Sequence, residues 1–268
     1  MPDDRYLLGN SSAEIEHLTR QAEVYAPEAE ELLDLVNVLP GGSAADIGCG
    51  ALGILAQLRH RVGSHGRVVG VDRDERILEV ARQLDAKLEI GAELVRTDAT
   101  ALDLPSDTFD LVHERTVLLN VTDPARVVSE MTRITRPGGV VALQEPDSAS
   151  WVCDPPHPAW DTLLAELLAA YASSGRNFDR GRMTARLLRD AGLVNVGVRA
   201  TARVTAAGEY YQTFLLTMTS LVREQILAAG RLRAADFDPM SASLREHLSL
   251  PGTLTSQPNM WQAWGTKP

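Results

Sequence analysis

A glycine-rich turn is the first segment of this 268-residue chain whose residue types suit chemistry. A short apolar run ends in Asp46 and leads into Gly48, Cys49 and Gly50, and a helical pattern follows. Glycines permit a tight turn and let a ligand lie against bare backbone, while the helix start offers unpaired N–H groups. Taken alone, the pattern indicates either a nucleotide-type ligand at the end of a β-strand or an ordinary turn between a strand and a helix.

Two further acids stand where the next two β-rich runs end. Asp72 closes the run Val68–Val71, and Asp98 follows the run Leu94–Arg96. A carboxylate in the first place can accept hydrogen bonds from a ribose diol, and one in the second can accept from an adenine amino group. The alternative for Asp72 is a cap on the helix that starts near Glu75.

These residues need a parallel sheet whose strands end at one edge. Short β-rich runs alternate with amphipathic helical runs as far as about residue 146, which is typical of a parallel sheet covered by helices on both faces. Beyond it, we interpret helical pieces as insertions over the carboxyl edge of the sheet. Expected strands are Ala44–Ile47, Val68–Val71, Leu94–Arg96, Phe109–His113, Val140–Leu143, Val194–Val204 and Trp261–Trp264; expected helices are 11–37 (split at Pro27), Ile54–Arg61, Glu75–Leu84, Ala125–Thr135, 157–175, 180–191 and 208–230.

Taken in order, these motifs resemble those of class I S-adenosylmethionine-dependent methyltransferases of the small-molecule type. The resemblance covers residues 40–147, and the order and spacing of its segments are specific together although each alone is common. The segments are Asp46–Gly50, Val71–Asp72, Asp98–Ala99 with Leu104–Pro105, Phe109–Val112 and Arg136–Gly139.

The resemblance implies the fold and the division of the chain. We expect an α/β fold with a doubly wound, Rossmann-like, mostly parallel seven-stranded sheet. Residues 1–40 would form an N-terminal helical lid. Residues 41–268 would form the methyltransferase domain, with helical insertions after strand five at about 147–192 and 208–250.

The resemblance also implies S-adenosyl-L-methionine as the cofactor and roles for its binding residues. Gly48 and Gly50 would contact the methionine part, Asp72 the ribose, and Asp98 with Ala99 the adenine. Asp46 would orient the loop and the cofactor's amino group, while Tyr6 would close over the cofactor, with Tyr25 on the same wall. The whole expected set is Asp46, Gly48, Cys49, Gly50, Asp72, Arg73, Asp98, Ala99, His113, Arg115, Tyr6 and Gln21.

Methyl transfer from a sulfonium is an in-line displacement, in which alignment can supply roughly 7–11 kcal/mol of the barrier. A general base is needed only when the acceptor must lose a proton, and His113, Glu145 and His157 are the candidates, with Asp147 beside them. Arg115 can pair with the cofactor carboxylate as a bidentate fork. The acceptor is expected to be a small molecule, and a secondary metabolite in particular.

An NAD(P)-dependent oxidoreductase is the alternative, since Gly48, Gly50 and Gly53 spell GxGxxG. Asp46 argues against it, because a carboxylate two residues before the first glycine sits badly beside a pyrophosphate and suits a cationic sulfonium and ammonium group. The dinucleotide motif also leaves Asp98 and the Pro-Gly-Gly segment unexplained.

Charge and composition limit the partners. The chain holds 26 basic and 36 acidic residues, a net charge of −10, and −7 of it falls on residues 1–40. No basic patch suits nucleic acid, no apolar run suits a membrane span, and two cysteines imply neither a disulfide framework nor a metal site. We therefore expect a cytoplasmic protein that binds no nucleic acid, membrane or metal. The acidic residues of the first helices are expected to form a solvated face. The sequence leaves open whether the chain forms a homo-oligomer.

Overall fold

The computed structural model describes residues 20–268, and these fall into two compact units. The sheet unit comprises residues 20–145, 181–199 and 261–268, and the insertion unit comprises residues 146–180 and 200–260. Each unit is described by itself below. The expected lid over residues 1–40 lies partly outside the described residues, and its boundary stays a prediction.

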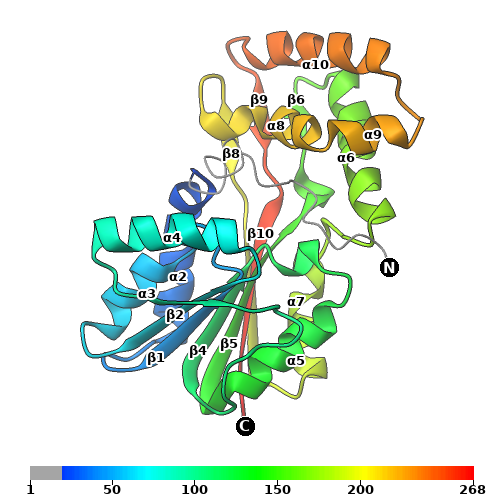
Figure 1. Cartoon of the computed structure of the whole chain (residues 1–268). Coiled ribbons are helices and arrows are strands. Elements are labelled where there is room, and N and C mark those ends of the chain that lie inside the picture. Colours follow the sequence, from blue (N-terminus) through cyan, green and yellow to red (C-terminus); the bar gives the residue numbers. More distant parts are fainter. Residues whose placement is uncertain (1–19) are drawn as a thin grey trace. The chain divides into compact units, whose positions relative to one another are not determined.

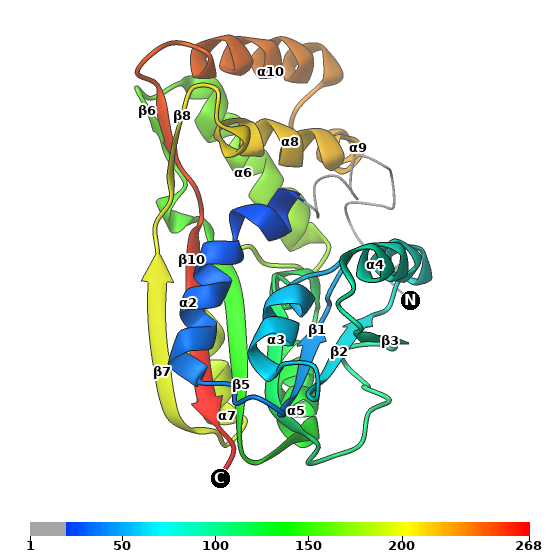
Figure 2. The same ribbon diagram turned by 90° about the vertical axis from the view of Figure 1, so that its left-hand side faces the viewer.

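The sheet unit is built on a seven-stranded sheet with the order β3-β2-β1-β4-β5-β10-β7 (Figures 1 and 2). The pairs β1–β2, β1–β4, β2–β3 and β4–β5 are parallel, so the carboxyl ends of these five strands meet at one edge. The predicted doubly wound, mostly parallel sheet is therefore confirmed. The strands are β1 (Ser43–Ile47), β2 (Arg67–Asp72), β3 (Glu93–Arg96), β4 (Phe109–Arg115), β5 (Thr135–Asp147), β7 (Val194–Thr201) and β10 (Asn259–Thr266).

Helices cover both faces of this sheet (Figure 1). On one face α2 (Ala26–Val36), α3 (Leu55–Val62) and α4 (Glu75–Leu88) bury apolar side chains against the strands. On the other face α5 (Pro124–Ile134) and α7 (Thr184–Asp190) do the same. Residues alternate between these two faces along each strand, so neighbouring positions at a strand end point to opposite sides.

The break between the first two helices lies close to its expected place. Residues 20–24 are helical, Tyr25 interrupts the helix, and α2 starts at Ala26 with Pro27 in its first turn. Proline is tolerated there because the first N–H groups of a helix have no intrahelical partner. The start of the preceding helix lies outside the described residues.

The insertion unit combines helices with a small sheet that the sequence did not predict. Its three strands β6-β9-β8 are antiparallel, and α6 packs against α8, α9 and α10. Its elements are β6 (Cys153–Asp154), α6 (Pro158–Ser173), β8 (Val204–Ala206), α8 (Phe214–Leu221), α9 (Arg223–Ala228), α10 (Ala234–Leu248) and β9 (Leu254–Ser256). Among residues 20–268, no helix has both the length and the apolar character that a membrane span requires.

The expected single strand Val194–Val204 is wrong. It divides into β7, which ends at Thr201, and β8, which begins at Val204 and pairs with β9 of the small sheet. Both segments alternate between apolar and polar residues, so the pattern alone could not reveal that the chain changes sheets between them. The expected helix 208–230 likewise divides into the turn Tyr210–Thr213, α8 and α9.

Candidate functional site

The glycine turn follows β1 and is shaped by positive backbone angles. Gly48 has φ 70° and Gly50 has φ 56°, in the left-handed region that favours glycine. A Cβ added at Gly48 would collide with Val117 of the loop after β4. A bare backbone at this turn is therefore required by packing as well as by conformation.

Asp46 belongs to a buried polar row across three adjacent strands. Its Oδ1 accepts a hydrogen bond from Nδ1 of His113 at 2.7 Å, and Nε2 of that ring lies 2.8 Å from Oε1 of Gln144. All three residues are buried on the face that carries α2 and α3. The second oxygen, Asp46 Oδ2, accepts from the backbone N–H of Ile54 at 3.0 Å, just before α3 begins. Asp46 thus ties β4 to the end of the glycine turn.

Asp72 reaches across to the glycine turn from the end of β2. Its Oδ2 accepts from the N–H of Gly50 at 3.1 Å, and its Oδ1 accepts from the N–H of Asp74 at 2.9 Å. Burial raises the pKa of Asp72 and outweighs these two hydrogen bonds, which lower it. The cap of α4 is Asp74, which accepts from Arg76 N at 2.9 Å, so the alternative of Asp72 as the helix cap is wrong.

Asp98 lies exposed, two residues after β3 ends. Its Oδ1 accepts from the N–H and the hydroxyl of Thr100, at 2.7 and 2.6 Å. Burial acts to raise the pKa of Asp98, but these two hydrogen bonds and the charge of Arg73 together hold it below the usual value. Asp98 is therefore a carboxylate at neutral pH, with Ala99 half-buried beside it.

Cys49 lies between the two glycines with its side chain buried. Burial, followed by the charges of Asp46 and Asp72, raises the pKa of this thiol well above its usual value. A thiol is a poor nucleophile compared with a thiolate, so Cys49 acts as a small apolar side chain in the turn.

Two glutamates form a second polar group on the opposite face of the sheet. Glu114 of β4 and Glu145 of β5 are completely buried, and both accept backbone hydrogen bonds from the turn Leu118–Asn120 or the residue before it. The sequence indicated Glu145 but missed Glu114. An acid inside an otherwise apolar strand was the signal that could have pointed to it.

Arg115 ends β4 and is almost completely buried. Its guanidinium carbon lies 5.9 Å from the centre of the Tyr25 ring, a cation–π distance. Tyr25 is buried and Gln21 is half-buried one helical turn earlier, and the wall that these two residues were expected to form with Tyr6 stays a prediction. Tyr6 lies outside the described residues.

His157 and Asp147 belong to the insertion unit, and both begin helical turns there. His157 Nδ1 accepts from Ala159 N at 3.2 Å as the cap of α6, and its ring stacks on His247 at 4.7 Å. Asp147 accepts from Ala149 N at 3.1 Å. Each residue thus has a structural role, and a catalytic role for His157 stays a prediction.

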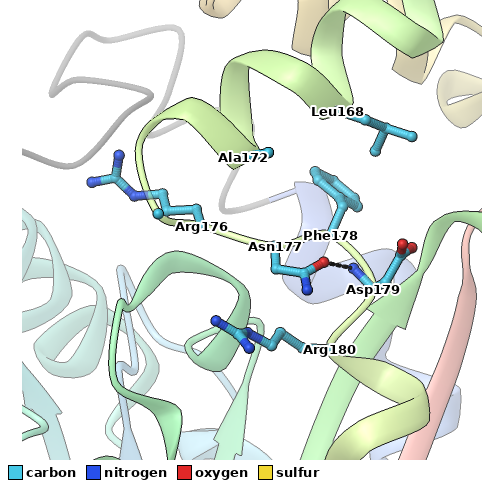
Figure 3. Close-up of a pocket in the computed structure, with 8 residues that line it drawn as sticks. Leu168, Ala172, Arg176, Asn177, Phe178, Asp179 and Arg180 are labelled. Atoms are coloured by element: carbon cyan, nitrogen blue, oxygen red, sulfur yellow. Dashed lines mark hydrogen bonds between the residues drawn. The ribbon is translucent and has the colours of Figure 1, made fainter.

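The insertion unit also holds an aromatic cluster and, separately, a cavity of about 420 Å³, whose lining residues are drawn in Figure 3. Trp151 packs on Trp160, Phe178 and Phe214, with ring centres 5.4 to 6.3 Å apart. These four aromatic side chains are buried in the core of the insertion unit, although Phe178 lines the cavity as well. The cavity is lined by Leu168, Ala172, Gly175, Arg176, Asn177, Phe178, Asp179 and Arg180.

Comparison with known proteins gives one family match. The model described as "Methyltransferase domain" matches residues 40–182, which is more than half of the chain and includes both polar groups of the sheet edge. A demethylmenaquinone methyltransferase of Bacillus cereus is 37% identical over 117 residues, which are 43% of this chain and 49% of that protein. The chain spans about half the length of the curated relatives it matches.

Solved structures with little sequence identity share the fold. A protein of Bacillus halodurans described as a putative methyltransferase has a TM-score of 0.61 at 17% identity, covering 89% of this chain and 97% of that one. A phosphoethanolamine N-methyltransferase of Haemonchus contortus, solved with S-adenosyl-L-methionine, has a TM-score of 0.51 at 17% identity, covering 86% and 49%. The oxidoreductase alternative has no support among these matches.

Proposed function

The chain belongs to the methyltransferase-domain family, as its sequence resemblance implies, and from that premise we propose that it binds S-adenosyl-L-methionine and methylates a small molecule. The relatives support this chemistry. One is named a demethylmenaquinone methyltransferase, and another a phosphoethanolamine N-methyltransferase that was solved with S-adenosyl-L-methionine. Both names denote small acceptors.

One observation carries the proposal: the carboxylate of Asp72 lies against the glycine turn, with its Oδ2 3.1 Å from the Gly50 amide. A ribose diol is a hydrogen-bond donor that a carboxylate at a strand end accepts. The backbone of the turn carries no side chain at Gly48, where Val117 packs directly against it. These residues fit an adenosine ligand that carries a cationic amino-acid end.

We assign the cofactor contacts by their place around this turn. Asp72 would hold the ribose hydroxyls and Asp98 the adenine amino group, since Asp72 ends β2 and Asp98 follows the neighbouring strand β3. Asp46 is the acid nearest the turn on β1, and its negative charge favours a sulfonium and an ammonium group. The other expected contacts are Gly48, Cys49, Gly50, Arg73, Ala99, His113, Arg115, Tyr6 and Gln21.

The bound cofactor would supply an electrophilic methyl group for in-line displacement. Each candidate for the general base is already hydrogen-bonded among the described residues: His113 through both ring nitrogens, Glu145 through both oxygens, and His157 through Nδ1. We therefore propose that alignment of the acceptor dominates the rate and that at most one of these residues takes a proton.

Labelled cofactor tests this proposal directly. The protein is incubated with S-adenosyl-L-methionine carrying a deuterated methyl group and with metabolite extracts, and mass spectrometry searches for small molecules that gain the label. Labelled products that disappear with the Asp72→Ala protein support the proposal; label that remains on the cofactor with every extract contradicts it. A secondary-metabolite acceptor, a homo-oligomer and a cytoplasmic location stay predictions.

A further inference from the structure

Glu114 and Glu145 form a buried carboxyl pair between two parallel strands. Glu114 of β4 is in register with Leu143 of β5, so Glu145, two residues further on, points to the same face of the sheet. Neither side chain has any exposed surface, and the two carboxyl groups accept from consecutive backbone amides of one turn. Two carboxylates that lie close together and away from water repel each other when both are ionised, so this arrangement favours a proton on the pair.

The pair receives three consecutive backbone amides from one turn. Val117 N donates to Glu114 Oε2 at 3.0 Å, while Leu118 N and Leu119 N donate to Oε1 and Oε2 of Glu145 at 2.6 and 3.1 Å. These amides lead into the 3-10 turn Leu118–Asn120, where they have no partner within the helix. The two side chains together therefore cap this turn.

The same turn forms a wall of the glycine loop. Val117 faces Gly48 so closely that no Cβ fits between them. The residue before it, Thr116, has φ 60°, a left-handed conformation that is uncommon for threonine, and its N–H donates to Gln144 O at 2.9 Å. Such a conformation persists only where surrounding contacts hold it in place.

We propose that Glu114 and Glu145 are positioning residues that hold the turn of residues 117–119 against Gly48, and that the turn keeps this place only while the pair retains its proton. Loss of the proton would leave two negative charges side by side without water, and their repulsion would separate the strand ends and the amides they bind. This inference rests on the proposed function, because it gives the glycine turn the role of holding the cofactor.

The charges around the pair agree with a retained proton. Burial raises the pKa of Glu114 to about 7, and burial together with the charge of Glu114 raises the pKa of Glu145 well above its usual value. The ionisable groups that act on Glu114 from neighbouring strands are Asp46 and His113. α5 and α7 cover the pair's face with apolar side chains, and Glu130 of α5 is paired with Arg133 at 2.8 Å.

Hydrogen exchange of the ligand-free protein tests the position of the turn without any cofactor. Protection factors for the amides of residues 117–119 are compared between about pH 6 and about pH 9.5 in the wild type, in Glu145→Gln and in Glu130→Gln. Glutamine has no proton to lose, but it keeps only one of the two oxygens that accept from Leu118 N and Leu119 N. The readout is therefore the change of protection with pH and not its absolute value. Glu130→Gln is the matched control, since it changes another buried carboxylate on the same side of the sheet.

We expect protection of the turn to fall at least about tenfold at the alkaline end in the wild type and in Glu130→Gln, and to stay constant in Glu145→Gln. The affinity for S-adenosylhomocysteine should follow the same pattern in a parallel calorimetric series. Equal pH dependence in all three proteins overturns the inference. If the exchange pattern is as expected but S-adenosylhomocysteine binds none of them, the proposed function fails and the positioning role stands.

Discussion

Nδ1 of His113 donates a hydrogen bond to Oδ1 of Asp46 at 2.7 Å, although the two residues are 67 positions apart in the chain. The contact joins β1 to β4 just before the glycine turn, and Asp46 Oδ2 extends it to the start of α3 through Ile54 N. The glycine turn is therefore held at both of its ends by one buried carboxylate.

Removing that carboxylate should be costly. Asp46→Ala leaves the buried His113 ring and the Ile54 amide without their acceptor, and we expect the free energy of unfolding to drop by about 3–5 kcal/mol. Urea denaturation measures the change. Asp238→Ala is the control, because that exposed acid pairs with Arg223 and should cost at most about 1 kcal/mol. Similar losses in the two variants would contradict the role given to Asp46.

Asp72→Ala should weaken binding of S-adenosylhomocysteine about tenfold to a hundredfold, because two charge-assisted hydrogen bonds to the ribose are lost. Asp74→Ala is its matched control: it removes the cap of α4 two residues away and should cost about 1 kcal/mol of stability without a comparable loss of affinity. Calorimetric titration of both proteins with S-adenosylhomocysteine measures these affinities. An unchanged affinity in Asp72→Ala would exclude the ribose role.

Gly48→Ala should impair the turn in two ways, since alanine disfavours φ 70° and its methyl group would collide with Val117. We expect at least a tenfold loss of cofactor affinity. The double variant Gly48→Ala/Val117→Ala removes the collision but not the backbone strain, so part of the loss should return. A double variant as weak as the sum of the two single variants would show that the side chains do not interact.

Stability should depend on pH through Glu114. An unfolded glutamate has a pKa of about 4.3, whereas burial raises the pKa of Glu114 in the folded protein to about 7. Between these values the folded state holds a proton that the unfolded state has released, so stability falls as the pH rises through this window. Glu114→Gln should lose this dependence, and its advantage over the wild type should grow by on the order of 2 kcal/mol from about pH 5 to about pH 8.

Denaturant midpoints of the two proteins at matched pH measure that difference, in which the titration of groups distant from Glu114 and Glu145 cancels. A constant difference across the window would mean that Glu114 is ionised in the folded protein at pH 5, as an exposed glutamate is.

The sequence predicted the glycine turn and the acids at the ends of β1 and β2, because the signals for their positions are local. The glycines indicate a tight turn at their own positions. The acid before them and the acid at the end of the next strand likewise mark where those strands end. The pairing of Glu114 with Glu145 and of His113 with Gln144 was beyond reach, since it depends on the register between β4 and β5. The register is determined by how whole strands pack together, so no single residue in the sequence indicates it.

Charge was interpreted less well than hydrophobic pattern. The acids of residues 1–40 were expected to form a solvated face, and of the described ones Glu23, Glu31 and Asp34 are exposed while Glu28 is buried. The sequence did not predict their ion pairs: Glu30 and Asp34 pair with Arg61, at 2.6 and 2.5 Å, and Glu31 pairs with Arg199. These arginines stand on α3 and β7, far along the chain. An excess of one sign in a segment therefore did not show where its counter-charges lie.

Calorimetric titration of the purified protein with S-adenosyl-L-methionine and, separately, with NAD⁺ tests the central claim most directly. The strand-end acids and the glycine turn predict saturable binding of S-adenosyl-L-methionine at a stoichiometry of about one and no measurable binding of the dinucleotide. Binding of NAD⁺ with no binding of S-adenosyl-L-methionine would contradict the account of the site and of the function proposed for it.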